Sequence, residues 1–508
     1  MRTTCPHQRF EHGLSVLPGV VGLLLMACRG SDMTPTSPSA ATGTVTVSPA
    51  AIVQTVALDY STPLLARGQT MQLEATLKNA AGEVLHPRAI AWKSSDPSIV
   101  QVKGFGLTGD LTATTQGTAT ITATIEGVSA TSEVTVVSFA TVSSGQFVTC
   151  AITGQGGLYC AGRNYGSKAQ LVVPTIRFST VSSYGGFGNS EVCALGIDGT
   201  AYCSGTTNTS GQLGVGDLIT RSTPTQVVGS ISFASISVGR DYACGLASNG
   251  DAYCWGNGST GQLGTGGTAN SSVPVPVQGG LKFTQLDAGN GTTCALTTSG
   301  KAYCWGRNDL GQLGVGHAGD QSWVPVPVGE PLAAIVMKQI VTRGPKTCGL
   351  TSAGRAFCWG NNTVGEVGAQ TTEVCPGEKP CSTYPLAVQT TAVFSSLAAS
   401  MFATCGVTSQ AGTLCWGMDF QYLFGSSPQD AVRKCDTFGT SYGCSAVPVK
   451  GPSGMLSVTG TYANYCGMRS NGVTYCWGGN DFGQRGWGDE MPDPTPQPFS
   501  IEPGATHF

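Results

Sequence analysis

The sequence contains few charged residues: Asp, Glu, Lys and Arg make up 11% of its 508 residues, against about 25% in ordinary soluble domains. Its lysines and arginines form no basic stripe, and the formal net charge is −3. Nucleic-acid binding therefore has little support, because it needs a concentrated positive surface. After the first 30 residues, no apolar run is long enough to cross a membrane as a helix.

Residues for familiar catalytic or metal-binding motifs are also scarce. The sequence has five histidines, and only His317 and His507 lie after residue 139. We find no nucleophile–base set, metal-ligand cluster, phosphate-binding loop or dinucleotide fingerprint. We therefore predict no cofactor, no metal and no catalytic residue, and we interpret the segment around His317 as a turn. The alternative is a hydrolase or lyase whose site is assembled from several repeats, with a carboxylate pair brought together by the fold.

Cysteine, by contrast, is abundant and regularly spaced. Seven pairs stand ten residues apart, and the first cysteines of successive pairs are 43 to 61 residues apart. A period of this length is typical of stacked repeats that each form one small supersecondary unit. The pairs are Cys150 with Cys160, Cys193 with Cys203, Cys244 with Cys254, Cys294 with Cys304, Cys348 with Cys358, Cys405 with Cys415, and Cys466 with Cys476.

Each pair predicts a β-hairpin. If Cys294 lies opposite Cys304, the connection is a three-residue loop that ends on Gly300, and glycine suits the left-handed conformation common there. The same register places a small residue opposite a large one in all seven repeats, as with Ala295 and Tyr303. Both faces of the hairpin are apolar, which favours a propeller blade over a sandwich strand with one polar face.

This register also brings the paired cysteines close enough to form disulfides. Zinc binding is the alternative, but metal sites usually have closer spacings such as C-x-x-C, which the sequence lacks. We predict nine disulfides, namely the seven ten-apart pairs together with Cys375–Cys381 and Cys435–Cys444. Only Cys5 and Cys28 remain, so the cysteine count fits export to an oxidising compartment.

The N-terminus has the features of a targeting segment. Two arginines precede an apolar run, Leu14 to Ala27, that is too short for a comfortable transmembrane helix. Its last residues, Leu-Met-Ala-Cys, resemble the lipobox of bacterial lipoproteins, which implies that Cys28 is lipidated. The alternative is an ordinary cleaved signal peptide with an incidental cysteine. We assign residues 1–27 to the signal and the Ser-, Thr- and Pro-rich residues 28–43 to a flexible tether.

Residues 44–137 lack cysteine and alternate short β-rich runs with turns, which predicts an all-β sandwich. The phrases Gly-Gln-Thr from residue 68, Trp-Lys-Ser-Ser-Asp-Pro from residue 92 and Gly-Thr-Ala-Thr-Ile from residue 117 resemble the bacterial Ig-like (group 2) domains. The resemblance implies a spacer or adhesive module, and we expect Trp92 to be a core residue.

The repeats in residues 139–503 resemble those of the RCC1 (regulator of chromosome condensation) family. The resemblance rests on Cys-Trp-Gly at the end of five hairpins, on Gly-Gln-Leu-Gly after three of them, and on Pro-rich strands such as Val273–Val277. It implies an all-β protein in which a seven-bladed RCC1-like β-propeller follows the Ig-like β-sandwich. We expect tryptophans to pack between blades, with a ligand-binding role as the alternative: Trp255, Trp305, Trp359, Trp416 and Trp477.

Repeats one and six depart from the family pattern, which leaves their loop geometry open. Cys-Ala-Gly replaces Cys-Trp-Gly in repeat one, and FQYLFGSS stands where repeat six should have Gly-Gln-Leu-Gly. No Pro-rich strand precedes repeat one, whereas the end of the chain has a spare one, Pro496 to Ile501. We predict that this segment pairs with the blade of Cys150 and Cys160 and so closes the ring.

The longest insertions follow the third strand of repeats five and six and should emerge on one face. A disulfide in each should lower the entropy lost on binding. We predict a non-catalytic, monomeric binding protein that is periplasmic or is held at the outer membrane or cell surface by a lipid anchor only. Its partner would be an extracellular or periplasmic protein or glycan; alternatively, these loops simply tolerate insertion. The candidate contact residues are Glu378, Lys379, Tyr384, Arg433, Lys434, Phe438 and Tyr442.

Overall fold

A computed structural model describes residues 52–85, 89–186, 189–329, 335–410, 412–419, 424, 433–437, 440–490 and 493–503, without the side chains of residues 186, 433–450, 493 and 494. The signal segment, Cys28, the tether and His507 lie outside these ranges. All regular elements within them are strands, and they include no helix that could span a membrane.

The N-terminal domain is a sandwich of two four-stranded sheets. Its strands are β1 Thr55–Leu58, β2 Leu64–Ala66, β3 Thr70–Lys78, β4 Ala91–Ser94, β5 Val100–Phe105, β6 Thr108–Ala113, β7 Gly117–Ile125 and β8 Val128–Val137. One sheet has the order β1-β3-β6-β5 and the other β2-β8-β7-β4. Burial alternates along β3 and β7, so one face of each strand packs into the core. Trp92 packs against this core, as predicted.

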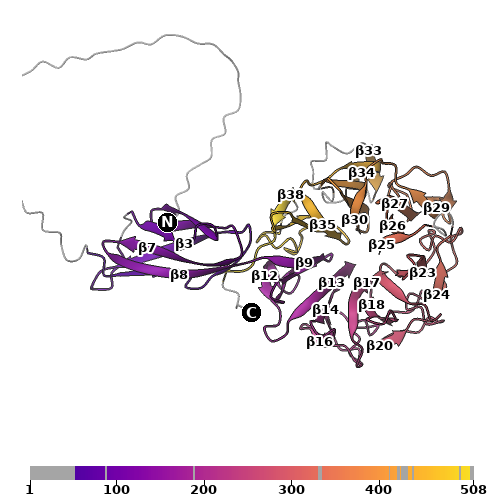
Figure 1. The fold of residues 1–508 in the computed structure, drawn as a ribbon, viewed down its shortest axis with the longest axis horizontal. Coiled ribbons are helices and arrows are strands. Elements are labelled where there is room, and N and C mark those ends of the chain that lie inside the picture. Colours follow the sequence, from indigo (N-terminus) through magenta and orange to yellow (C-terminus); the bar gives the residue numbers. More distant parts are fainter. Residues whose placement is uncertain are drawn as a thin grey trace, which may run out of the picture. The chain divides into compact units, whose positions relative to one another are not determined.

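The described strands after residue 138 form seven consecutive sheets, each built from one repeat. Figure 1 shows them following one another around a ring. Their strands are β9 Phe139–Ser144, β10 Val148–Thr153, β11 Leu158–Gly162, β12 Gly166–Leu171; β13 Phe178–Gly186, β14 Asn189–Gly196, β15 Ala201–Gly205, β16 Thr225–Gln226; β17 Phe233–Gly239, β18 Tyr242–Ala247, β19 Ala252–Gly256, β20 Ser271–Pro276; β21 Phe283–Ala288, β22 Thr292–Thr297, β23 Ala302–Gly306, β24 Ser322–Pro327; β25 Met337–Arg343, β26 Lys346–Thr351, β27 Ala356–Asn361, β28 Val374–Cys375, β29 Lys379–Ala387; β30 Phe394–Ala399, β31 Ala403–Thr408, β32 Thr413–Met418, β33 Arg433–Thr437, β34 Thr440–Lys450; β35 Met455–Gly460, β36 Asn464–Arg469, β37 Thr474–Gly478 and β38 Asp493–Pro498.

The hairpin register matches the sequence prediction in every repeat. Cys294 lies opposite Cys304 and Ala295 opposite Tyr303, and Gly300 has a φ of 74°. The other six ten-apart pairs of cysteines also lie directly opposite each other on neighbouring strands.

Eight of the nine predicted disulfides are present in the structure. The bonded pairs are Cys150–Cys160, Cys193–Cys203, Cys244–Cys254, Cys294–Cys304, Cys348–Cys358, Cys375–Cys381, Cys405–Cys415 and Cys466–Cys476. The side chains of the ninth predicted pair, Cys435 and Cys444, are outside the described residues, so that disulfide stays a prediction.

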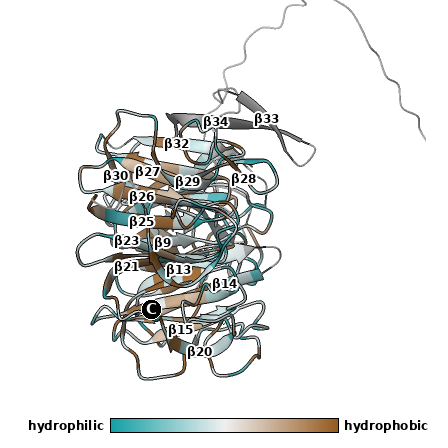
Figure 2. Ribbon diagram, turned by 90° about the vertical axis from the view of Figure 1, so that its right-hand side faces the viewer, coloured by the Kyte–Doolittle hydropathy of each residue, from teal (hydrophilic) through white to brown (hydrophobic). Residues whose placement is uncertain are grey.

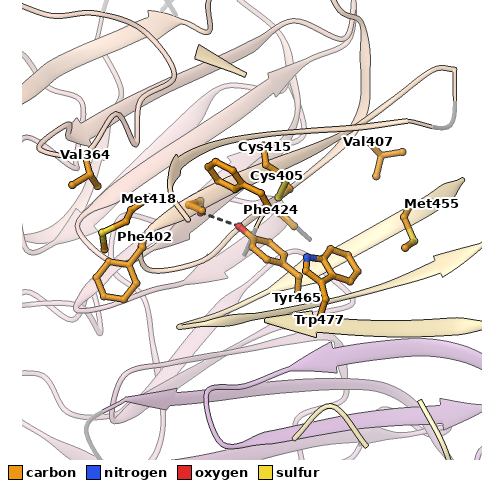
Figure 3. Packing of buried hydrophobic residues seen from close by; sticks show 12 residues of the cluster. Val364, Phe402, Cys405, Val407, Cys415, Met418, Phe424, Met455, Tyr465 and Trp477 are labelled. Atoms are coloured by element: carbon orange, nitrogen blue, oxygen red, sulfur yellow. Dashed lines mark hydrogen bonds between the residues drawn. A yellow bond between two sulfur atoms is a disulfide. The ribbon is translucent and has the colours of Figure 1, made fainter. Parts of the chain in front are cut away.

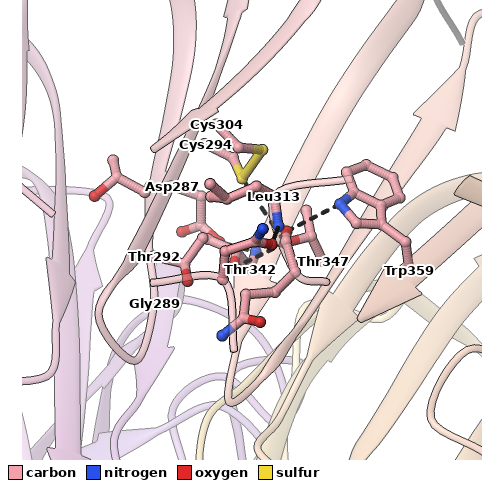
Figure 4. The surroundings of a disulfide bond; sticks show 12 residues. Asp287, Gly289, Thr292, Cys294, Cys304, Leu313, Thr342, Thr347 and Trp359 are labelled. Atoms are coloured by element: carbon pink, nitrogen blue, oxygen red, sulfur yellow. Dashed lines mark hydrogen bonds between the residues drawn. A yellow bond between two sulfur atoms is a disulfide. The ribbon is translucent and has the colours of Figure 1, made fainter. Parts of the chain in front are cut away.

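The space between blades is filled by aromatic and aliphatic side chains from both neighbours. All five Cys-Trp-Gly tryptophans are fully buried, which confirms their packing role. Trp359 donates its indole N–H to the carbonyl oxygen of Gln312 in the preceding blade at 3.0 Å, close to the Cys294–Cys304 disulfide (Figure 4). Figure 2 shows apolar colouring on strands such as β13, β27 and β30, in keeping with sheets packed on both sides.

The two described loop residues of repeat six keep one hydrogen bond of the other repeats despite the different sequence. In repeat four, Asn308 accepts a hydrogen bond from the amide of Leu313 at 3.1 Å and donates to the carbonyl of His317 at 2.9 Å. Repeat six has Asp419 at this place, and it accepts from the amide of Phe424 at 2.7 Å. Phe424 is buried among Met418, the Cys405–Cys415 pair and residues of the next blade (Figure 3).

Asp419 gives a stability prediction, because its carboxyl is buried and burial raises its pKa to about 6. The folded protein then binds this proton more tightly than the unfolded chain, so stability falls as the pH rises from about 4 to above 6. Asp419→Asn restores the usual side chain of this loop and removes that fall. We expect it to raise the free energy of unfolding by about 1–3 kcal/mol at pH 7 and to have little effect at pH 4. Denaturant unfolding at both pH values measures this difference; an equal loss of stability at both would contradict it.

The predicted closure by the C-terminal strand is wrong in its main part. Strand β38 pairs with β37 of its own blade, and blade one has its own outer strand, β12. The segment after β38 does reach blade one, because Ile501 forms a parallel bridge with Ala169 of β12. The ring is otherwise closed by contact between the innermost strands of the last and first blades, β35 and β9.

The same C-terminal residues also contact the Ig-like domain. The side-chain amide of Gln69 donates to the carbonyl of Ile501 at 2.8 Å and accepts from its backbone N–H at 2.9 Å. Phe499 and Ile501 are buried in one apolar cluster with Leu64 and Val137. The Ig-like domain is therefore packed against the end of the propeller chain, beyond the spacer role that the sequence suggested.

Candidate functional site

The innermost strands of the blades expose backbone groups toward the central channel, and side chains of neighbouring blades satisfy them. Gln285 of blade four exchanges two hydrogen bonds with the backbone of Ile340 in blade five, at 2.9 and 3.2 Å. Gln339 of blade five does the same with Leu397 of blade six, at 2.8 and 2.9 Å. These contacts protect edges that would otherwise be open to pairing with another chain.

One face of the propeller carries both the turns after the innermost strands and the loops after the third strands. The amide of Asn257 donates to the carbonyl of Asp241 at 2.8 Å, and that of Asn361 to Pro345 at 2.9 Å. Each bond joins a loop of the second kind to a turn of the first within one blade. Because the blade-five insertion follows a third strand, it begins on this face, as predicted, whereas the start of the blade-six insertion lies outside the described residues. We call this face the loop face.

The insertion of blade five is a hairpin made by β28 and β29 and clamped by the Cys375–Cys381 disulfide. Its second strand is tied to the loop after β27, because the amide of Asn362 donates to the carbonyl of Pro380 at 2.9 Å. The predicted contact residues Glu378 and Lys379 lie at its exposed tip.

The other predicted contact residues are dispersed. Tyr384 is 45% exposed on β29 and packs beside Gly316 of blade four. Arg433 and Lys434 lie on β33 and Tyr442 on β34, but their side chains are outside the described residues, as is the whole of Phe438. Among the predicted contact residues whose side chains the structure describes, Glu378 and Lys379 lie together and Tyr384 lies apart from them, while the pairing of β33 with β34 places the backbones of Lys434 and Tyr442 on neighbouring strands.

A second group of residues meets where the central channel opens on the loop face. Tyr184 of blade two lies near Arg343 of blade five, whose guanidinium carbon is 5.9 Å from the ring centroid. Burial raises the pKa of Tyr184 to about 12, while Arg343 and Arg240 favour its ionised form and Asp241 and Tyr462 oppose it. These five side chains come from four blades, and we call them the channel mouth.

The channel mouth holds two ion pairs. Arg343 lies 2.9 Å from Asp287, with 13% and 14% of the two side chains exposed. Asp287 also accepts from the Ser237 hydroxyl at 2.9 Å and from the amide of Thr342 at 2.7 Å. Arg240 lies 3.7 Å from Asp241 in a more exposed pair. Beside the first pair is a cavity of about 200 Å³ lined by residues of blades four to seven.

Glu191 of blade two lies behind this group. Burial, with a smaller contribution from Asp241, raises its pKa well above the usual value. Its Oε1 atom is closed to solvent and lacks a hydrogen-bond partner in the described part of the chain. Glu191 and Asp241 form the kind of carboxylate pair from different blades that a propeller enzyme would need.

Sequence reasoning missed the channel mouth because its residues are far apart in the sequence. It also did not consider variation at one buried repeat position, which includes the neighbouring Glu191. The residue opposite the last glycine of each Cys-Trp-Gly-type triplet differs in every blade although it is always buried. In chain order these residues are Val148, Glu191, Tyr242, Thr292, Lys346, Ala403 and Asn464. Charged residues at a buried, repeated position in a chain with little charge are a signal that could have marked this region.

His317 lies in a loop and only its backbone carbonyl is engaged, by Asn308. Within the ranges that the structure describes, no group of three His, Cys, Asp or Glu side chains could hold a metal ion.

Comparisons with known proteins identify both domains. The model of the regulator of chromosome condensation (RCC1) repeat matches residues 198–246, 249–296 and 299–340, and a second RCC1 repeat model matches 233–262 and 283–312. The bacterial Ig-like domain (group 2) model matches residues 52–136. The chain therefore contains RCC1 repeats preceded by a bacterial Ig-like domain. No curated protein sequence matches it.

Solved RCC1-type propellers have the same fold. Human WBSCR16 is 19% identical, with a TM-score of 0.56 over 66% of this chain and 85% of that one. Prp20p from Saccharomyces cerevisiae, in a study of its binding to Gsp1p and histones, is 18% identical, with a TM-score of 0.52 over 63% and 80%. Yeast RCC1 (Prp20) bound to Kap60 is 19% identical, with a TM-score of 0.53 over 63% and 78%. At these identities the likeness shows the fold alone.

Proposed function

We propose that this protein is an exported, non-catalytic binding module whose propeller holds a protein partner on the loop face. A propeller of RCC1 repeats is typically a scaffold for protein binding. The observation that carries the proposal is the disulfide-clamped hairpin of blade five on the same face as the channel mouth. A rigid exposed hairpin on the same face as a cluster of tyrosine and arginine suits a protein contact, because such residues are enriched at interfaces.

Export and lipid anchoring are part of the proposal and are supported by the lipobox-like sequence before Cys28 and by the many disulfides. The protein would then act as a monomer in the periplasm or at the outer surface. If Cys28 carries the lipid, Cys28→Ala should leave the membrane fraction or remain unprocessed. An unchanged distribution between membrane and soluble fractions would reject the anchor.

Replacing the hairpin tip tests the binding face. The variant exchanges residues 376–379 for Gly-Ser-Gly-Ser and keeps the Cys375–Cys381 disulfide. Wild type and variant are used as bait in periplasmic and surface extracts of the source cells, and captured proteins are quantified by mass spectrometry. We expect the proteins enriched by wild type to fall about tenfold or more with the variant, because a lost contact cluster of 1–2 kcal/mol changes affinity by that amount.

The matched control replaces residues 228–230, the exposed part of the connection between blades two and three on the opposite face, with a Gly/Ser segment of equal length. This control should capture as wild type does, and both variants should retain the wild-type melting temperature. Undiminished capture by the tip variant, or a loss caused only by the control, would reject the loop face as the binding surface.

A further inference from the structure

Arg343 at the channel mouth uses only one edge of its guanidinium group. Its Nη1 donates to Asp287 at 2.9 Å, to the carbonyl of Ala288 at 2.6 Å and to that of Thr342 at 2.9 Å. Its Nε atom is buried, yet it lacks a hydrogen-bond partner among the described residues. An unsatisfied buried donor costs free energy, so this edge of Arg343 is prepared for an acceptor that the chain itself does not supply.

Resting on the binding function proposed above, we propose that the Nε–Nη2 edge of Arg343 binds the carboxylate of an aspartate or glutamate side chain of the protein partner. The two parallel N–H groups of a guanidinium edge match the two oxygens of a carboxylate. The adjoining cavity of about 200 Å³ is lined by Arg343 and its partner Asp287, by Gln339 and Val341, and by residues of blades six and seven. It is smaller than the roughly 300–1,000 Å³ of small-molecule sites, so it suits a single inserted side chain.

The charges around Arg343 are compatible with such a guest. Asp287 is held by Arg343 itself, by Ser237 and by the backbone of Thr342. Across the opening, Asp241 is paired with Arg240 and accepts a hydrogen bond from Asn189 at 2.8 Å. Both aspartates thus have partners of their own, and Arg240 adds a second cation.

The remaining titratable neighbours add no opposing charge near neutral pH. Tyr184 and Tyr462 stay neutral, because burial raises their pKa values. The Glu191 carboxyl lies behind them and favours its protonated form for the same reason. A partner carboxylate in the channel mouth would therefore have arginine and neutral tyrosine side chains as neighbours and no unpaired negative charge.

The position of Arg343 also fits contact by one partner with both parts of the loop face. Arg343 ends strand β25, and the turn that follows includes Pro345, whose carbonyl accepts the amide of Asn361. The clamped hairpin lies at the outer edge of the same blade, since the strand order is β25-β26-β27-β29-β28. A partner that spans the loop face from this hairpin to the innermost strand would place an acidic side chain in the channel mouth.

Short synthetic peptides provide the probe. The test uses five-residue alanine peptides with acetylated and amidated ends and with Glu, Asp or Gln at the centre, together with an all-alanine peptide that has a free C-terminal carboxylate. Binding to the full-length protein is measured by calorimetry or by NMR titration. We expect the Glu or Asp peptide to bind at least about tenfold more tightly than the Gln peptide, a difference within the range of charge-assisted hydrogen bonds.

Arg343→Lys is the decisive variant, because it keeps a positive charge beside Asp287 but lacks the planar fork. It should retain the wild-type melting temperature and lose the preference for Glu or Asp over Gln. Arg355→Lys, at an exposed turn of the same blade on the opposite face, should keep that preference.

Three results would overturn the assignment: equal binding of the Glu and Gln peptides, a preference unchanged by Arg343→Lys, or no binding of any peptide up to about 10 mM. Binding of only the free-carboxylate peptide would also overturn it and indicate a chain terminus as the guest. None of these results affects capture through the hairpin tip, so failure of this inference is separable from failure of the proposed function.

Discussion

Truncation of the chain after Pro498 is expected to lower the free energy of unfolding by more than about 4 kcal/mol. Phe499 is 1% exposed and Ile501 is fully buried, and deletion of large buried side chains commonly costs about 2–5 kcal/mol each. The truncation also removes the reciprocal hydrogen bonds between Gln69 and Ile501 and leaves the buried Gln69 amide without them.

Truncation should destabilise blade seven, blade one and the Ig-like domain together, because residues 499–503 contact all three. These residues continue from blade seven, bridge to Ala169 of blade one, and meet Gln69 and Leu64 of the Ig-like domain. Gln69→Ala should give a smaller loss of about 1–3 kcal/mol. Under non-reducing conditions, limited proteolysis should then cleave the Ig-like domain and blade one before the middle blades.

Glu502→Ala is the matched control, since Glu502 contributes only its backbone amide to the bridge with Ala169. Its unfolding midpoint should stay at the wild-type value. If truncation after Pro498 leaves both the midpoint and the order of cleavage unchanged, the C-terminal segment does not join the two domains.

The repeated hairpin could be predicted from the sequence because several independent constraints point to one register. The cysteine spacing, the glycine that ends each loop and the small–large pairs all require Cys294 to face Cys304. A shift by one residue would turn every side chain to the other face of the strand. No alternative register satisfies these constraints together, and the structure has the predicted one in all repeats.

Strand β12 could not be predicted in this way, since it lacks the Val-Pro-Val phrase of the outer strands β20, β24 and β34. Its sequence, Gly-Ser-Lys-Ala-Gln-Leu, is half exposed, and only Ala169 is fully buried. Pairing with β11 and the bridge to Ile501 fix it in place, and these are tertiary contacts that local sequence does not encode. The spare Pro-rich segment at the chain end was therefore assigned to the wrong blade.

The channel mouth escaped prediction for a related reason. Tyr184, Arg240, Arg343 and Tyr462 are far apart in sequence and meet only because the ring closes. The blade-five hairpin, by contrast, is a local feature with its own cysteine pair, and its position on the loop face followed from the order of strands within one repeat.

Blade five contains a buried charge pair where blade four has two neutral residues. Lys346 is fully buried and donates to the carbonyls of Ser400 and Met401 at 2.7 and 3.2 Å. Glu366, which replaces the glutamine of the Gly-Gln-Leu-Gly loops, is 3% exposed. Burial lowers the pKa of Lys346 to about 8 and raises that of Glu366, while each charge partly opposes the shift of the other. The equivalent residues in blade four are Thr292 and Gln312.

Either single replacement should therefore be destabilising, whereas the double replacement should recover much of the loss. Glu366→Gln leaves a buried ammonium group without its counter-charge, and Lys346→Thr leaves a buried carboxylate and two unpaired carbonyl groups. No ion pair joins the two side chains in the described part of the chain, so each single replacement should cost less than the roughly 3–5 kcal/mol of a broken buried ion pair. The double variant reproduces the side chains of blade four. We expect its loss of stability to be about 1–3 kcal/mol smaller than the sum of the two single losses.

The pH dependence gives a second measurement of the same pair. Between the folded pKa of Lys346, about 8, and the unfolded value near 10.5, the unfolded chain binds more protons than the folded protein. The free energy of unfolding of the wild type should thus rise with pH across this window relative to that of Lys346→Thr, by up to about 3 kcal/mol. Guanidinium unfolding of wild type and Lys346→Thr is measured at pH 7 and pH 10 without reductant. Both proteins have the same tyrosines, so the difference between their pH profiles gives the contribution of Lys346 to the free energy of unfolding. Additive single effects together with parallel pH profiles would show that Lys346 and Glu366 are not coupled through charge.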